Sequence, residues 1–298
     1  RDRRLAYALG AYWTDRGMVG LAQSLSERSL ARPGSDAPTV HRCAGLFTAG
    51  QDAYFAGDSV TADRRLAEAL ALADQLGDER WAMRIAGAHG AALVGLGRVE
   101  EAQRQFERAL TLARRFGDGQ VAASAAGLLG TLLRLSGDFD GAEARYREAL
   151  DLAKLAGEDD DAAIALLNVT IVRLLAHRTT GASESLTEVL RIAEAIDSVL
   201  LVQYAADAAA GLAAEIRDWP AVACWGATAQ ALIQSTGLQR DAADEAFVAP
   251  RIEEARRQLG PDAFGLAAGA APSTQVEARA ALRDWLRTAQ SAVAQSPI

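Results

Sequence analysis

Apolar residues recur along this chain at the spacing of a helix face, in blocks that end at glycine. Between Glu100 and Gly117 they follow one another at steps of three and four residues: Ala102, Phe106, Ala109, Leu110 and Ala113. This spacing predicts one apolar face on a helix. Acidic residues open the block and Arg114 and Arg115 close it, and both arrangements suit the helix dipole. Gly117 is a typical residue at which such a helix ends.

The same block recurs without gaps every 40 residues. The three clearest copies are GDSVTADRRLAEALALADQLGD from Gly57, GRVEEAQRQFERALTLARRFGD from Gly97 and GDFDGAEARYREALDLAKLAGE from Gly137. Weaker copies continue the frame in both directions, so that six units cover residues 1 to about 238. A second column precedes the first and consists of Gly10, Gly50, Gly90 and Gly130, continued by Thr170 and Ala210. The spacing predicts two helices in each unit.

Small residues indicate how the two helices pack. A glycine column on the first helix and an alanine column on the second, which includes Ala102 and Ala142, allow two backbones to approach closely. A bulky residue one turn later fills the next gap: Leu66, Phe106 and Tyr146. One helix pair cannot bury its own apolar face, so neighbouring pairs must stack. A long coiled coil is excluded because glycines interrupt every unit.

This order of small, bulky and alanine columns resembles the tetratricopeptide repeat. The resemblance implies an all-α fold: a right-handed α-solenoid of about six helix pairs over residues 1–238, followed by a C-terminal helical cap over residues 239–298. The unit of 40 residues is longer than the usual ~34. Glycine also stands where the family usually has proline.

A narrower resemblance rests on the unit ends and on the C-terminal part. Units that close with Gly77-Asp78 or Gly117-Asp118, the stretch AVACWGATAQALIQSTG and the tail that begins at Arg251 resemble one family. It is the C-terminal repeat domain of bacterial NB-ARC/STAND-type ATPase transcriptional regulators, of the LuxR/AfsR-like, actinobacterial kind. In that family an upstream ATPase module and a DNA-binding domain carry out the chemistry and the DNA contact. The resemblance therefore implies that this chain is a piece of a longer protein.

Composition narrows the class of function. The net charge of -8 and a pI near 5.1 argue against direct binding to nucleic acid. Cys43 and Cys224 lie far apart, which fits a reduced cytoplasmic setting and no disulfide framework. No apolar stretch approaches the ~20 residues of a membrane-spanning helix. We expect a cytoplasmic protein without a membrane segment.

Motifs for catalysis or metal binding are missing from the sequence. Nothing fits a phosphate loop, and His41, His89 and His177 fall at different repeat positions. The acidic run 158–161 precedes an expected helix at Ala162 and suits its N-terminus better than it fits a calcium loop. We therefore expect no cofactor, no metal and no catalysis in this chain.

A binding groove is the expected functional surface, since the first helices of tetratricopeptide arrays line a concave face. By periodicity, the groove positions are Arg4, Tyr7, Phe47, Gln51, Tyr54, Arg84, Thr131, Arg134, Tyr204 and Asp207. Arg84 and Arg134 are candidates for pairing with an acidic peptide or a C-terminal carboxylate. Tyr7, Phe47 and Tyr54 are candidate aromatic anchors. The alternative is that the arginines are solvated and the aromatic residues belong to the core between units.

Two later helices need further burial. The first presents apolar residues over much of its surface: Ile164, Leu167, Ile171, Leu174 and Leu175. A neighbouring segment, a dimer partner or a ligand would each cover them. The second is a last helix, capped by Ser273 or Thr274 with Glu277 as capping-box partner. Its expected apolar face, which should cover the last repeat, is Val276, Ala280, Leu282 and Trp285.

The sequence predicts a sensor or scaffold domain of a bacterial regulator. A protein or peptide, or else a small-molecule effector, would bind the groove and bias an attached switch domain. The alternative is a stand-alone adaptor that assembles a protein complex. The residues that precede Arg1 in the full gene distinguish the two, because a phosphate loop there supports the sensor.

Overall fold

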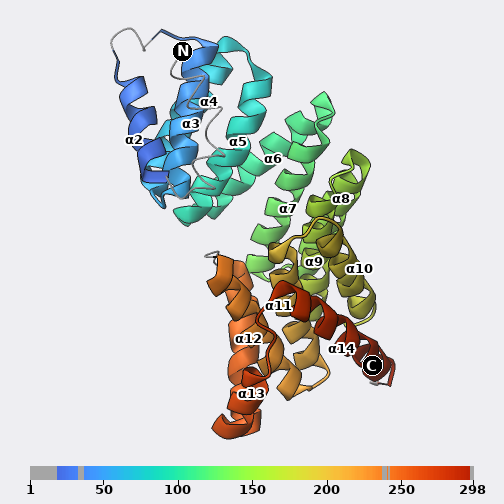
Figure 1. Ribbon diagram of the computed structural model, residues 1–298. Coiled ribbons are helices and arrows are strands. Elements are labelled where there is room, and N and C mark those ends of the chain that lie inside the picture. Colours follow the sequence, from blue (N-terminus) through green and yellow to red (C-terminus); the bar gives the residue numbers. More distant parts are fainter. Residues whose placement is uncertain (1–18, 33–36, 237–239, 241, 296–298) are drawn as a thin grey trace. The chain divides into compact units, whose positions relative to one another are not determined.

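A computed structural model describes residues 19–32, 37–236, 240 and 242–295 (Figure 1). Within these residues the chain forms thirteen helices and no strand. The helices are α2 (Val19–Leu30), α3 (Val40–Phe55), α4 (Ser59–Leu76), α5 (Glu79–Gly95), α6 (Val99–Phe116), α7 (Gly119–Ser136), α8 (Phe139–Ala156), α9 (Asp159–Leu175), α10 (Ala182–Ala195), α11 (Val199–Glu215), α12 (Trp219–Thr236), α13 (Ala242–Gly269) and α14 (Gln275–Gln295). The predicted all-α repeat fold is confirmed.

Helices α3 to α12 follow the predicted frame of 40 residues, two helices to a unit. Helix α2 occupies the place of the second helix of the first unit. The expected first helix of that unit, with the predicted groove residues Arg4 and Tyr7, lies outside the described residues. The described part of the chain therefore contains five of the six predicted pairs in full.

Two compact units make up the chain, residues 1–129 and residues 130–298. In the first unit, one core joins α3, α4 and α5 through Leu46, Leu66 and Ile85. In the second unit, the largest core joins the helices from α9 to α14 and includes Leu186 and Phe247. Each unit thus buries apolar residues from several consecutive helices, as stacked repeats require.

Left-handed residues end the helices at intervals of 20 residues. They are Gly57, Gly77, Gly97, Gly117, Gly137, Gly157, His177, Asp197 and Arg217. The residue after most of them accepts a hydrogen bond from the backbone N–H three residues further on: Asp58, Asp78, Asp118, Asp138, Ser198 and Asp218. The recurrent Gly-Asp pairs of the sequence are therefore a C-terminal cap followed directly by an N-terminal cap.

The glycine column of the first helices makes room for bulky side chains. A Cβ atom on Gly90 would lie 2.5 Å from the ring of Phe106, and one on Gly130 would lie 2.8 Å from the ring of Tyr146. The sequence correctly predicted the glycine and alanine columns. It was wrong to expect the alanines to lie opposite the glycines, because bulky side chains lie there. Ala102 is fully buried, yet the nearest neighbours of the glycine positions are the side chains of the bulky column: Leu66 at Gly50, Phe106 at Gly90 and Tyr146 at Gly130.

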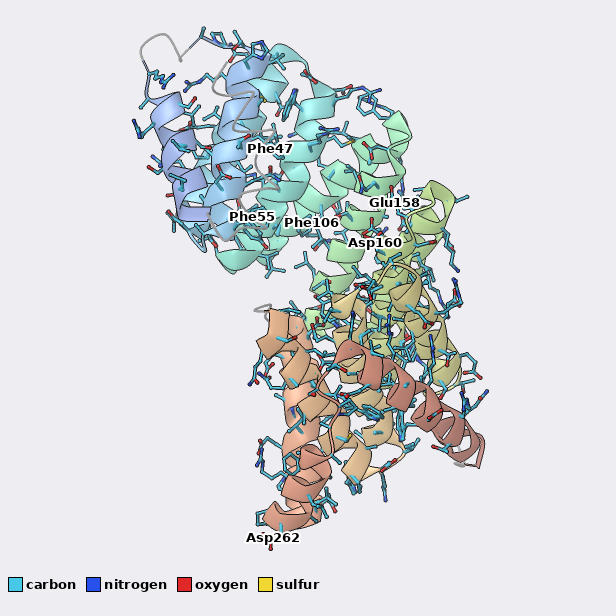
Figure 2. All side chains as sticks on the ribbon, in the orientation of Figure 1. Phe47, Phe55, Phe106, Glu158, Asp160 and Asp262 are labelled. Atoms are coloured by element: carbon cyan, nitrogen blue, oxygen red, sulfur yellow. The ribbon has the colours of Figure 1, made fainter. Side chains whose placement is uncertain are left out.

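Helix α9 is covered by neighbouring helices of its own unit. Leu167, Ile171 and Leu174 are buried in the core that α9 shares with α10 and α11. Of the three expected ways to bury this apolar helix, a neighbouring segment is the one found. The helix also begins at Asp159 and not at Ala162, so the acidic run lies within its first turn (Figure 2). Its negative charges lie at the positive end of the helix dipole, which is favourable, and the N-cap side chain of Glu158 makes no capping hydrogen bond.

The two C-terminal helices cover different parts of the second unit. Helix α13 packs on α12 and α11, whereas α14 packs on α10 and α11. The prediction that the last helix covers the last repeat is confirmed in part. Helix α14 lies on α11, and its Trp285 ring meets Trp225 of α12 edge to face at 5.7 Å between centroids, while α13 packs on the same two helices. The buried residues of α14 are Ala278, Leu282, Leu286 and Ala289. Val276, which was assigned to this face, is 62% exposed. Thr274 caps the helix as predicted, since its hydroxyl accepts from the backbone N–H of Glu277 at 3.3 Å.

Overpacking tests the alanine column. Ala142 is fully buried on α8, and Ala144 is exposed on the same helix. We expect Ala142→Leu to lower the free energy of unfolding by ~1–3 kcal/mol, because the added carbons have no space. Urea denaturation measures the change, with Ala144→Leu as the control. Equal stability of the two variants would contradict the burial of this column.

A glycine comparison tests the close approach to Phe106. Gly90→Ala should lower the free energy of unfolding by ~1–3 kcal/mol, because the new methyl group would overlap the ring. Gly87 lies on the same helix with nothing within 4 Å of its Cβ position. Gly87→Ala should therefore raise stability by about 1 kcal/mol through helix propensity. Thermal melting that shifted both variants in the same direction would count against this packing.

Arg217 offers a test of the left-handed helix ends. It has a φ of 60° at the position where six earlier helices of the array end at glycine. We expect Arg217→Gly to raise the free energy of unfolding by about 0.5–1 kcal/mol, since glycine has no Cβ strain there. Gly157→Ala, at φ 76°, should change stability in the opposite direction. Urea titrations of both variants check the pair of signs.

Candidate functional site

The predicted groove positions fall in both compact units, and each unit is described by itself. Eight of the ten positions lie in the described residues, on the first helices of their pairs. Those of the first unit are Phe47, Gln51, Tyr54 and Arg84, and those of the second unit are Thr131, Arg134, Tyr204 and Asp207. The pairing of Arg84 and Arg134 with an acidic peptide or a C-terminal carboxylate remains a prediction, and the two residues belong to different units.

A pocket of about 270 Å³ in the first unit includes Arg84. It is lined by Asp78, Arg80, Trp81, Met83, Arg84 and Asp118. Most of these residues belong to the first two turns of α5, and the two aspartates are the residues just before α5 and α7. The side chain of Arg84 is exposed and that of Trp81 is half-buried. The pocket is therefore open to solvent at its basic side.

Packing behind the pocket holds its side chains in place. The indole of Trp81 meets Phe47 edge to face, with ring centroids 5.6 Å apart. The guanidinium of Arg80 lies 4.8 Å from the centre of the Phe116 ring. Phe47 is only 6% exposed, so it supports Trp81 and belongs to the core, the second of its two expected roles. A pocket with supported walls loses little conformational entropy when a ligand binds.

The aspartates of the pocket are partly engaged as helix caps. Asp78 accepts from the backbone N–H of Trp81 at 3.1 Å, and Asp118 accepts from that of Val121 at 3.1 Å. The pocket thus combines an indole face, two guanidinium groups and two partly engaged carboxylates. Its volume lies just below that of pockets for drug-sized ligands, which suits one side chain or one chain terminus. A carboxylate beside an apolar group would match the arginines and the indole.

The other predicted residues of the first unit lie on α3. Tyr54 is 39% exposed and meets Phe55 edge to face at 5.6 Å between ring centroids. Gln51 is half-buried on the same helix. Figure 2 shows Phe47 and Phe55 along this helix. The end of α3 therefore presents an aromatic surface, as one of the two alternatives for Tyr54 predicts.

A larger hollow on the second helices was missed by the sequence reasoning. It has a volume of about 710 Å³ and is lined by Ala73, Asp74, Gly77, Glu79, Arg104, Glu107, Arg108, Thr111 and Leu112. Within its walls Arg108 pairs with Asp74, and Glu79 pairs with Arg115 nearby. The hollow and the Arg84 pocket both combine basic and acidic side chains, and the Arg84 pocket adds the indole of Trp81. The sequence signal that could have revealed this hollow is the pairing of oppositely charged residues almost one repeat unit apart, as in Asp74 with Arg108 and Glu79 with Arg115.

Arg134 in the second unit is buried and not solvated. Its side chain is 4% exposed, and its Nη2 donates to Oδ1 of Asp244 at 2.9 Å. The Nε and Nη1 atoms of the same guanidinium have no hydrogen-bond partner. Asp244 comes from the start of α13, 110 residues further along the chain. A buried arginine therefore depends on one carboxylate from a distant segment.

Asp207 forms the second buried ion pair of this unit. Arg240 donates to both of its carboxylate oxygens, at 2.8 and 2.9 Å, and the amide of Gln203 donates at 2.8 Å. Burial raises the pKa of Asp207, and the Arg240 guanidinium opposes that rise. Burial would lower the pKa of Arg240, but Asp207 raises it above its ordinary value.

The two remaining residues of the second unit have internal contacts. The hydroxyl of Thr131 lies 3.0 Å from that of Tyr146, and Tyr204 packs against the core of its unit. Periodicity found the first-helix positions Arg134 and Asp207. It missed their partners, Arg240 and Asp244, because these residues lie outside the repeat frame.

Other chemistry is not supported among the described residues. They contain no group of three or more His, Cys, Asp or Glu side chains placed to hold a metal ion. None of their helices is both long and apolar enough to cross a membrane. His89 lies in an ion-pair network, with Nε2 2.7 Å from Asp63, which also accepts from Arg98 at 2.7 Å. Burial raises the pKa of Cys43 to about 11, so its thiol stays protonated at neutral pH.

A family model of the tetratricopeptide repeat matches residues 81–154 and 120–195. The match begins at Trp81 and ends with α10. The 40-residue frame continues beyond it on both sides. Residues 81–195 therefore match tetratricopeptide repeats. No curated protein matches the chain.

Solved structures share the fold along most of this chain at low sequence identity. A Rap protein complexed with competence and sporulation factor is 15% identical with a TM-score of 0.69, over 99% of this chain and 76% of that one. The Rap conjugation gene regulator of plasmid pLS20, in complex with the Phr* peptide, is 16% identical with a TM-score of 0.56, over 86% and 74%. A signal transduction ATPase with numerous domains and a tetratricopeptide repeat sensor, from Pyrococcus horikoshii, is 15% identical with a TM-score of 0.59. This last match covers 96% of our chain and 42% of that protein.

Proposed function

We propose that this array of tetratricopeptide repeats is the peptide- or protein-binding sensor domain of a larger bacterial regulator. The observation that carries the proposal is the pocket on α5, where Arg84 and Trp81 present a basic and an aromatic surface to solvent. Packed arrays of this kind use such surfaces to bind partners. The chain itself would act by binding, without catalysis and without a cofactor.

The proteins that share the fold support a peptide as ligand. Two of them are described with a bound factor or peptide, and a third has its repeats as the sensor of a signal transduction ATPase. At this low identity the likeness shows the fold alone, so the peptide remains our proposal for this chain. The size of the pocket adds to it, since about 270 Å³ suits one acidic side chain or a C-terminal carboxylate.

The regulator context is the finer part of the proposal. An ATPase switch and a DNA-binding domain upstream of Arg1 would convert occupancy of the groove into a transcriptional response in the cytoplasm. The net charge of -8 supports a division of labour in which another domain contacts DNA. A stand-alone adaptor is the alternative, and the absence of a phosphate loop from the full gene would favour it.

Loss of Arg84 tests the pocket. A fluorescein-labelled peptide, selected on the wild-type chain from a random library displayed on phage, serves as the probe. Arg84→Ala should weaken its binding about tenfold, which corresponds to ~1.4 kcal/mol, because a charged hydrogen bond to the ligand is lost. Fluorescence anisotropy measures the dissociation constants.

A matched arginine controls for the loss of positive charge. Arg64 is exposed on the second helix α4 and lies outside the pocket. Arg64→Ala should bind the peptide as the wild type does. If Arg84→Ala kept wild-type affinity while remaining folded by circular dichroism, the pocket would not be the peptide site. If both variants weakened binding equally, the effect would reflect net charge alone.

A further inference from the structure

Two buried ion pairs connect the start of α13 with predicted groove positions of the second unit. Arg240 pairs with Asp207 on α11, and Asp244 pairs with Arg134 on α7. All four side chains are at most 15% exposed. A short charged segment of the chain therefore lies on the helix positions that the repeat pattern assigns to ligand binding.

The two ion pairs are satisfied to different extents. The Arg240 pair has two hydrogen bonds to one carboxylate, and Gln203 adds a third. The Arg134 pair has a single hydrogen bond, and its Nε and Nη1 are buried without a partner. Guanidinium groups bind carboxylates best through two parallel hydrogen bonds. Arg134 is therefore a carboxylate receptor that Asp244 fills incompletely.

The rest of α13 is held by a different interaction. The ring of Phe247 packs directly on Gly211, since a Cβ atom added to this glycine would lie 2.2 Å from the ring. Val248 and Ala255 are fully buried. Glu245 and Ala246 are exposed. Release of Arg240 and of the first turn of α13 would therefore free the two charged residues while the apolar contacts keep the helix in place.

Release of the segment leaves Arg134 and Asp207 without their charge partners in a poorly solvated site, which is costly. The release therefore requires a ligand that supplies the same two charges. A ligand that supplies the same charges forms the same two ion pairs and so offsets the free energy that is lost on release. The internal segment is part of the same chain, so its effective concentration at the site is high. An external ligand must therefore bind tightly enough to compete with that effective concentration.

We propose that the start of α13 is an internal occupant of the second unit's binding site, and that a peptide with a basic residue four positions before an acidic residue replaces it. The basic residue of the peptide forms an ion pair with Asp207. Its acidic residue forms an ion pair with Arg134 through two hydrogen bonds. The inference rests on the proposed function as a peptide-binding array. It adds the charge pattern of a ligand and the segment that competes with it.

A peptide cut from the chain itself tests the proposal. The probe is a fluorescein-labelled synthetic peptide with the sequence of residues 236–250, and the protein is the full chain. Arg240→Gln with Asp244→Asn weakens the internal occupant and keeps its shape. This double variant should bind the peptide about tenfold more tightly than the wild type. A peptide that carries Arg240→Asp and Asp244→Arg should not bind to it.

The control removes another ion pair from the same helix. Glu253 and Arg256 pair at 3.5 Å on the surface of α13. Glu253→Gln with Arg256→Gln should bind the labelled peptide as weakly as the wild type. If the Arg240–Asp244 variant is folded and gains no affinity over this control, the internal occupant is disproved. Binding that depends on Arg84 would survive that result, so the proposed function fails or stands separately.

If the double variant does not fold, hydrogen exchange of the wild-type chain tests whether a peptide displaces the start of α13. Excess unlabelled peptide should speed amide exchange in residues 243–246 and leave residues 252–256 unchanged. Exchange that stays the same throughout α13 would show that the two ion pairs are a fixed part of the fold, and would overturn the proposal.

Discussion

The array depends on a chain reversal that recurs every 20 residues. At each reversal one residue adopts the left-handed conformation, and through most of the array the next residue caps the following helix. Glycine takes the left-handed conformation without the Cβ strain that other residues meet. Because the turn has a constant length, successive helices have nearly constant lengths, and their faces stay in register. The position of every side chain in the pocket follows from that register.

The register places the column glycines Gly50, Gly90 and Gly130 of the first helices opposite a bulky side chain of the second. Gly90 and Phe106 show the principle, since a single added carbon would overlap the ring. Because the glycine face of the first helix packs on its partner helix, the opposite face does not contribute to that contact. On α5 Arg84 is exposed, whereas its neighbours Met83 and Ile85 are buried. Packing inside the helix pair therefore determines which side chains of α5 remain exposed.

The two units use their charges differently. In the first unit, arginines near the pocket are exposed or lie on aromatic rings, as Arg80 does on Phe116. In the second unit, Arg134 and Asp207 are buried and matched by charges of the chain itself. Burial makes those ion pairs specific for one partner geometry, because a misplaced charge would remain unpaired in a poorly solvated site. The second unit is thus selective where the first is open.

The sequence by itself determined the repeat, the helix ends and the columns that pack inside each pair. These features are local: a period of 40, a left-handed glycine and an aspartate cap each act within one or two turns of the chain. Their signals therefore appear directly in the order of residues. The same reasoning predicted which first-helix positions could carry recognition, including Arg84, Arg134 and Asp207.

Only the tertiary structure decided what those positions contact. Asp244 reaches Arg134 across 110 residues, and no periodicity links the two. It also decided that α13 covers the last pair, that α14 lies on α10 and α11, and that Phe47 supports Trp81 from the core. Each of these outcomes depends on which surfaces remain exposed once the array has stacked. A pattern of single residues carries no information about that, because burial is a property of the assembled helices.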